Sequence, residues 1–105
     1  MSNKKLSTKA LHSGHEVDLT QGTRAVPIYQ STSYVFNDSA HAANLFALSE
    51  PGYIYTRLNN PTNDILEKRL ADIEGGIGAV VTTSGASAIS TALLVLLKAG
   101  DHIVA

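Results

Sequence analysis

A tyrosine hydroxyl and a guanidinium stand two residues apart at Tyr55 and Arg57, directly before a helix-start signal at residues 60–62. In an extended segment, residues two apart leave the same face, so both side chains could bind one anion. Arginine offers a planar fork of N–H donors and tyrosine adds a single O–H. The spacing therefore predicts a phosphate-binding pair. The alternative is a surface pair whose side chains only pack together or bind a carboxylate.

A second candidate anion-binding element is the turn at residues 82–87, where Ser84, Gly85 and Ala86 open a helix. The start of a helix presents unpaired N–H groups and partial positive charge. Gly85 has no Cβ, so an anion can approach the backbone closely, and Ser84 and Ser87 can add hydroxyl donors. The alternative is an ordinary serine cap. Two such elements in one chain indicate a phosphorylated cofactor.

Helical segments are expected to position these residues. A short turn of helix is expected near residues 6–11 in an otherwise irregular, polar N-terminal segment. Capping residues at 37–39 predict a helix over residues 40–48. Pro61 and the apolar spacing that follows predict a helix that ends at Gly75 and Gly76. A last helix is expected over residues 86–98, apolar nearly all round and therefore suited to a larger body.

Extended segments are expected between the helices. Residues 25–36 carry the β-branched and aromatic side chains that strands favour. Residues 77–83 and 102–105 flank the last helix, which predicts a βαβ unit of a parallel sheet. A parallel sheet needs more strands and cover on both faces, so we expect the chain to be the front of a longer protein.

The composition and charge of the chain exclude several classes of binding partner. The chain has 105 residues, a net charge of −1 and a pI near 6.4, so it fits at most one domain and has no basic footprint for nucleic acid. It has no cysteine, which excludes a disulfide framework and a thiolate metal site. Its longest apolar run, residues 92–97, is too short to span a membrane. A soluble cytoplasmic protein whose partner is a small molecule or another protein is expected.

The sequence gives less support to other catalytic or metal-binding residues. His12 and His15 are three residues apart, but nothing nearby completes a metal shell, so two solvated histidines are expected. His102 follows Asp101 directly after a helix and is read as a turn residue. Ser84 lacks the glycine-flanked elbow and the histidine base of a nucleophile.

Several segments together resemble the front of the Cys/Met-metabolism pyridoxal-phosphate enzymes, in the order of that family. They are residues 26–36, 55–62, 70–76, 84–86 and 99–104. The most specific part is Tyr-x-Arg followed by Asn-Pro-Thr. The family includes cystathionine γ-synthase, cystathionine γ-lyase, methionine γ-lyase and O-acetylhomoserine sulfhydrylase, and residues 39–48 look most like the last of these.

The resemblance implies a fold and a site. The fold would be the α/β fold-type I aminotransferase-like α/β/α architecture with an extended N-terminal arm. Residues 1–60 would form the arm and subunit-contact segment, and residues 61–105 the start of the domain that binds pyridoxal 5'-phosphate. In a homodimer or homotetramer, Tyr55 and Arg57 would contact the cofactor phosphate bound in a neighbouring subunit. Backbone N–H groups of Gly85 and Ala86, with Ser84 at the turn, would hold the phosphate in the home subunit. Many members carry Met or Gln at the position of Ala86, a change that a backbone contact survives.

The resemblance also implies an activity. An O-acylhomoserine would exchange its γ-acyloxy group for sulfide or a thiol, giving homocysteine or methionine. Pyridoxal phosphate needs a lysine, yet Lys4 and Lys5 lie in the arm, Lys68 on a wet helix face and Lys98 at the far end of the last helix. No catalytic residue is expected within this chain, and the isolated chain should be inactive. Alternatives are a cystathionine γ-synthase, a methionine γ-lyase, or a non-catalytic module for phosphate-ligand binding or subunit interaction.

Overall fold

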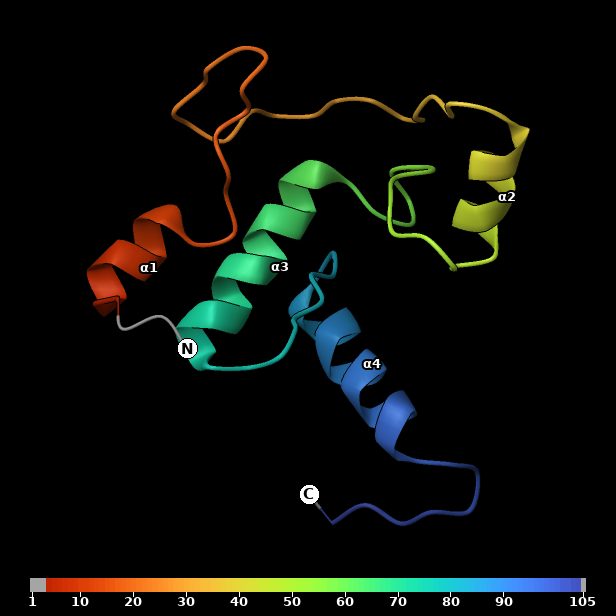
Figure 1. The fold of residues 1–105 in the computed structure, drawn as a ribbon. Coiled ribbons are helices and arrows are strands. Elements are labelled where there is room, and N and C mark those ends of the chain that lie inside the picture. Colours follow the sequence, from red (N-terminus) through yellow and green to blue (C-terminus); the bar gives the residue numbers. More distant parts are fainter. Residues whose placement is uncertain (1–3, 105) are drawn as a thin grey trace.

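The computed structural model describes residues 4–104, and within them the chain folds into helices joined by long loops (Figure 1). The helices are α1 (Leu6–His12), α2 (Ser39–Phe46), α3 (Pro61–Glu74) and α4 (Gly85–Leu96). The arrangement is open. Its radius of gyration is 17.0 Å, whereas a compact domain of this length has about 13 Å.

The starts of α2, α3 and α4 follow from side-chain caps, whereas α1 begins after Lys5 without one. The Asp38 side chain accepts a hydrogen bond from the N–H of His41 at the start of α2. Asn60 caps α3, with Pro61 in the first turn. At the other end of α3, Gly75 has φ 70°, the left-handed geometry that glycine adopts most easily. The predicted helices are therefore confirmed, with ends that differ by one or two residues.

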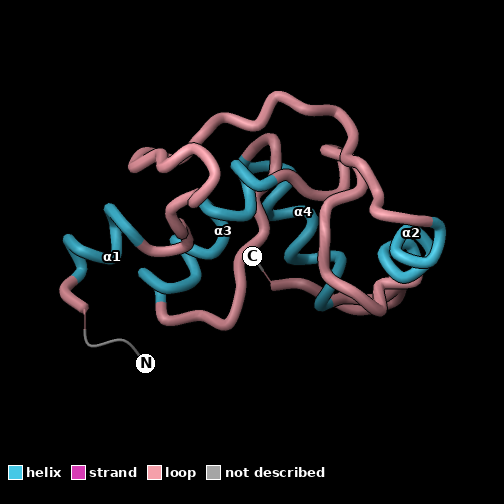
Figure 2. Tube along the Cα trace, turned by 45° about the horizontal axis from the view of Figure 1, so that its top comes forward, coloured by secondary structure: helices cyan, strands magenta, loops and turns pink. Residues whose placement is uncertain are grey.

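The predicted strands are not formed in the part of the chain that the structure describes. Residues 25–36, 77–83 and 102–104 run as loops (Figure 2), and Ala105 lies outside the described residues. Isolated bridges join Asp18 to Thr23 and Ser33 to Tyr55. A strand exists only when a neighbouring strand accepts and donates its backbone hydrogen bonds, and the segments on either side of α4 do not pair. The expected βαβ unit is therefore wrong for this chain taken alone.

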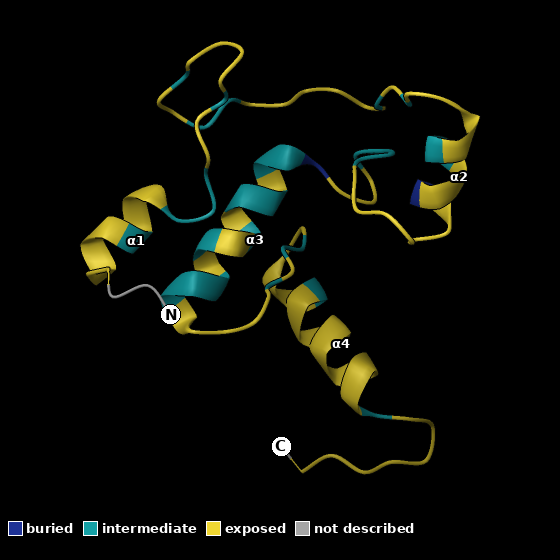
Figure 3. Cartoon of the chain, in the orientation of Figure 1, coloured by how far each residue is buried: buried dark blue, intermediate teal, exposed yellow. Residues whose placement is uncertain are grey.

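Few side chains are buried (Figure 3). Among the described residues, Leu45 at 2% exposed and Asn60 at 5% are the ones that fall in the buried class. The apolar residues of α4 lie open, with Leu94 78% exposed. Such exposure fits the expectation that α4 packs within a larger body.

Helices α1 and α3 are in contact through a polar joint. The Lys9 ammonium donates to the backbone oxygen and to Oδ1 of Asp72, each at 2.9 Å. The Ser13 hydroxyl donates to the other carboxylate oxygen, and Arg69 Nε donates to the Ser13 carbonyl at 2.8 Å. The hydrogen bonds from Ser13 and Lys9 hold the pKa of Asp72 below its usual value. The predicted irregular arm is thus anchored on α3 by α1.

Candidate phosphate-binding site

Tyr55 and Arg57 lie side by side, although not for the reason that the sequence suggested. Residues 55–58 form a turn, in which the N–H of Leu58 donates to the Tyr55 carbonyl at 2.8 Å, and not an extended segment. The turn brings Cζ of Arg57 to 5.1 Å from the centroid of the Tyr55 ring, a cation–π contact. Arg57 is exposed and forms no ion pair within residues 4–104. Its charge is free to bind an anion.

The turn is held by a neighbouring loop. Ser33 and Tyr55 form an antiparallel bridge. On either side of it, the Tyr34 N–H donates to the Ile54 carbonyl at 3.2 Å, and the Thr56 N–H donates to the Thr32 carbonyl at 2.9 Å. Because backbone hydrogen bonds flank Tyr55, the backbone that carries its ring is held by residues more than twenty positions earlier in the sequence.

The second predicted element is an ordered helix start. Ser84 Oγ accepts from the N–H of Ser87 at 3.1 Å, and the two hydroxyls are 3.0 Å apart. No hydrogen bond in the described part of the chain uses the N–H of Gly85 or of Ala86. Gly85 and Ala86 are both exposed, and a Cβ placed on Gly85 would meet nothing within 4 Å, so this end of α4 is uncovered. Ser84 serves as the cap, and the next two residues present free donors.

Within one chain the two elements stay separate. The 55–58 turn lies near α2, and the start of α4 follows the loop after α3 (Figure 1). No hydrogen bond or ion pair among residues 4–104 joins them. Their convergence on one phosphate between two subunits remains a prediction.

The donor set fits the phosphate of pyridoxal phosphate. Arg57 supplies a permanent positive charge and Tyr55 an O–H, while Gly85 and Ala86 supply N–H groups at the positive end of a 12-residue helix. These groups can all donate hydrogen bonds to a dianion.

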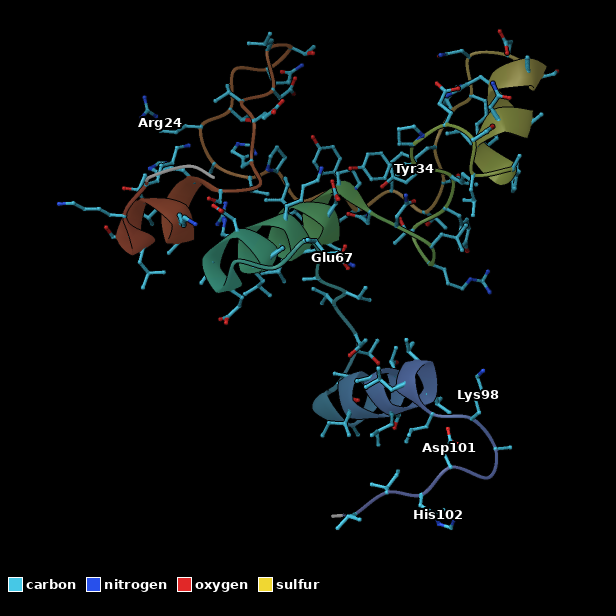
Figure 4. All side chains as sticks on the ribbon, turned by 60° about the horizontal axis from the view of Figure 1, so that its bottom comes forward. Arg24, Tyr34, Glu67, Lys98, Asp101 and His102 are labelled. Atoms are coloured by element: carbon cyan, nitrogen blue, oxygen red, sulfur yellow. The ribbon has the colours of Figure 1, made fainter. Side chains whose placement is uncertain are left out.

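Lysines near these elements are already engaged or distant. Lys68 Nζ forms an ion pair with Asp64 at 2.7 Å. Lys98 lies past the end of α4, where its backbone N–H donates to Oδ2 of Asp101 at 2.7 Å (Figure 4). The position expected for Lys98, at the opposite end of α4 from Ser84, is confirmed.

A polar cavity beside α3 was not anticipated from the sequence. It has a volume of about 620 Å³, and its lining includes His15, Tyr53, Asp64 and Lys68. The Tyr53 hydroxyl donates to Asp64 at 3.0 Å. Burial, and then the hydrogen bond and charge of Asp64, raise the pKa of Tyr53 to about 12. The only signal in the sequence is the tyrosine itself, since its partner is eleven residues away.

The two histidines considered for a metal site lie beside the same cavity. His12 and His15 both line this cavity, and Nε2 of His15 is buried without a hydrogen-bond partner. Across residues 4–104 no three His, Asp or Glu side chains gather in a way that could hold a metal ion. None of the helices in the same span has both the length and the apolar character needed to cross a membrane.

Comparison with known proteins decides the family. The model of the family described as "Cys/Met metabolism PLP-dependent enzyme" matches residues 7–105. The chain belongs to that family. This family assignment confirms the resemblance seen in the sequence.

Two curated relatives are similar to nearly the whole of this chain. The chain is 59% identical over 103 residues to an O-acetyl-L-homoserine sulfhydrylase of Leptospira meyeri, and 56% identical over 97 residues to a homocysteine synthase of Schizosaccharomyces pombe. These matches cover 98% and 92% of this chain but 23% of each relative. The chain therefore spans about a quarter of the length of the curated relatives it matches.

Solved structures of related enzymes match the fold of this chain. A crystal structure from Campylobacter jejuni, described as a "putative O-acetylhomoserine (thiol)-lyase (metY)", matches with a TM-score of 0.90 and 45% identity, over 94% of this chain and 24% of that one. That structure carries N'-pyridoxyl-lysine-5'-monophosphate at position 205. A metB structure from Corynebacterium glutamicum matches with a TM-score of 0.83 and 34% identity, over 95% of this chain and 24% of that one. The fold class is thus confirmed as fold-type I, of which this chain forms the N-terminal part.

Proposed function

We propose that this chain forms the front of a pyridoxal-phosphate-dependent O-acetylhomoserine sulfhydrylase. The observation that carries the proposal is the 59% identity to a protein of that name over nearly the whole chain. The enzyme would replace the γ-acyloxy group of an O-acylhomoserine with sulfide or a thiol and so serve methionine biosynthesis in the cytoplasm. An L-methionine gamma-lyase of Fusobacterium nucleatum is 50% identical, which makes methionine γ-lyase the second candidate.

We assign the phosphate of the cofactor to two half-sites. Tyr55 and Arg57 of one subunit form the first, because Arg57 has no other ion-pair partner in the described chain and lies against the tyrosine ring. Gly85 and Ala86 of a second subunit, behind the Ser84 cap, form the other. This assignment makes residues 1–60 the arm and subunit-contact segment and residues 61–105 the start of the cofactor domain.

The half-sites orient the cofactor and leave the chemistry to other groups. When bound, pyridoxal phosphate would supply an electron sink for the reaction of the amino-acid substrate. Arg57 and the start of α4 would hold the cofactor by its phosphate and would offset the negative charge of that group. Lys68 is paired with Asp64, so among the described residues this lysine is engaged and is not assigned a catalytic role.

Activity of the full-length protein tests the proposal. Purified enzyme is given O-acetylhomoserine with sulfide, O-acetylhomoserine with cysteine, or methionine alone. The proposal predicts homocysteine from the first mixture at the highest kcat/KM. Faster breakdown of methionine would favour the γ-lyase, and faster formation of cystathionine would favour cystathionine γ-synthase. Absence of all three, together with absence of cofactor binding, would favour a non-catalytic module.

Residues 1–105 alone provide a second test. With no lysine placed for an imine, the isolated chain should show no visible cofactor absorbance that disappears on borohydride reduction. Such a band would contradict the proposal that this chain lacks the lysine.

A further inference from the structure

Asn60 is a buried polar side chain with more hydrogen bonds than a helix cap requires. Its Oδ1 accepts from the N–H of Thr62 at 2.9 Å, which caps α3. Its Nδ2 also donates to the Tyr29 carbonyl at 2.9 Å and to Thr56 Oγ1 at 3.1 Å. The amide is 5% exposed. Asn60 therefore joins α3, the loop before α2 and the 55–58 turn.

Thr56 lies between Tyr55 and Arg57 in the 55–58 turn, and hydrogen bonds hold it from both sides. Its hydroxyl accepts from Asn60 and donates to the Ser31 carbonyl. Its N–H donates to the Thr32 carbonyl at 2.9 Å. A residue with this many fixed bonds has little freedom to rotate, so its two chain neighbours leave the backbone in set directions.

We propose that Asn60 is a positioning residue for the cofactor, acting through Thr56 on Tyr55 and Arg57. The inference rests on the proposed cofactor site. Arg57 is exposed and its guanidinium is held by one ring contact, so its direction depends on the backbone that carries it. Donors that are fixed before binding lose less freedom when the ligand arrives, which strengthens the binding.

The link is tested on the full-length apoprotein by titration with pyridoxal phosphate. Asn60→Ser keeps a good helix cap while removing both Nδ2 donors. We expect the Kd of the cofactor to rise roughly tenfold, the amount set by losing one to two hydrogen bonds of ordinary strength. Thr56→Val, which deletes the hydroxyl, should act alike. Asn63→Ser is the matched control, because Asn63 is exposed on α3 and its side chain makes no hydrogen bond within the described residues.

A double mutant separates positioning from simple destabilisation. In a Tyr55→Phe, Arg57→Ala background, Asn60→Ser should lower Tm by as much as it does in the otherwise unchanged protein but cause no further rise in Kd. An equal further rise, or an unchanged Kd in Asn60→Ser itself, would overturn the positioning role. If Asn60→Ser does not fold, Thr56→Val in the same two backgrounds decides the question.

The same series separates this inference from the proposed site. An unchanged Kd in Arg57→Ala would remove Arg57 from the cofactor site, and the positioning role would fall with it. A raised Kd in Arg57→Ala with an unchanged Kd in both Asn60→Ser and Thr56→Val would overturn the positioning role alone.

Discussion

Gly14 sits where the arm meets α3, and replacing it with alanine should release α1. Its φ is 77°, and an added Cβ would lie 2.6 Å from the Ile65 carbonyl oxygen, 2.9 Å from Lys68 Cβ and 3.0 Å from the Arg69 nitrogen. Two of these atoms belong to the backbone of α3. They cannot move aside without unwinding the helix, so the clash must be relieved by separating the arm from α3.

The cost has two parts. A non-glycine residue in the left-handed region costs about 1–2 kcal/mol. Overpacking against fixed atoms adds about 1–3 kcal/mol. Gly22 is the matched control, because its φ is 64° and a Cβ there would meet nothing within 4 Å. Gly22→Ala should therefore cost only the first part, and Gly14→Ala should exceed it by about 1–3 kcal/mol.

Hydrogen exchange in the full-length protein measures this difference locally. The reporters are the amides of Lys9 and Ser13, which bond the Lys5 and Lys9 carbonyls at 3.0 Å in α1. Their exchange should quicken in Gly14→Ala by about tenfold to a hundredfold relative to Gly22→Ala. Equal exchange in the two variants would show that the close approach to α3 does not hold the arm, and would refute the reasoning.

Three further predictions concern the site and the joint. Arg57→Ala should raise the cofactor Kd about 30-fold through the loss of about 2 kcal/mol, and Arg57→Lys should restore part of this by returning the charge without the fork; equal Kd values in a spectroscopic titration would contradict both. Ser84→Asp should keep the cap, and so Tm, while weakening cofactor binding through repulsion of the phosphate, whereas an unchanged Kd would place the anion elsewhere. Hydrogen bonds from Ser13 and Lys9 lower the pKa of Asp72. The stability that they add to the contact between α1 and α3 is therefore present above pH 3.8, the ordinary pKa, and is lost as the pH falls through the lowered pKa. Protease cleavage of the arm should rise over that range in the native protein, and Asp72→Asn should show the higher cleavage already at neutral pH.

Local signals in the sequence predict α2, α3 and α4 because each capping side chain lies within a few residues of the N–H that it binds. Asp38, Asn60 and Ser84 are each bonded by their side chain to an N–H two or three residues ahead. Gly75 likewise ends α3 with its own backbone angle. Such features need no information from the rest of the fold.

Features that depend on distant partners could not be predicted in the same way. The strands expected at residues 77–83 and 102–105 need neighbouring strands to pair with, and the described residues do not form such a pairing. Asn60 was read as a helix start, but its bond to Tyr29 spans 31 positions and leaves no local pattern. The proximity of Tyr55 and Arg57 was predicted from an extended geometry and arises from a turn.

The central claim is that two subunits share one cofactor phosphate, and a crystal structure of the full-length holoenzyme tests it most directly. We predict the Arg57 guanidinium and the Tyr55 hydroxyl of one subunit within hydrogen-bonding distance of the same phosphate that the Gly85 and Ala86 N–H groups of its neighbour bind. A phosphate bound without Arg57, or with both half-sites drawn from a single chain, would contradict the account.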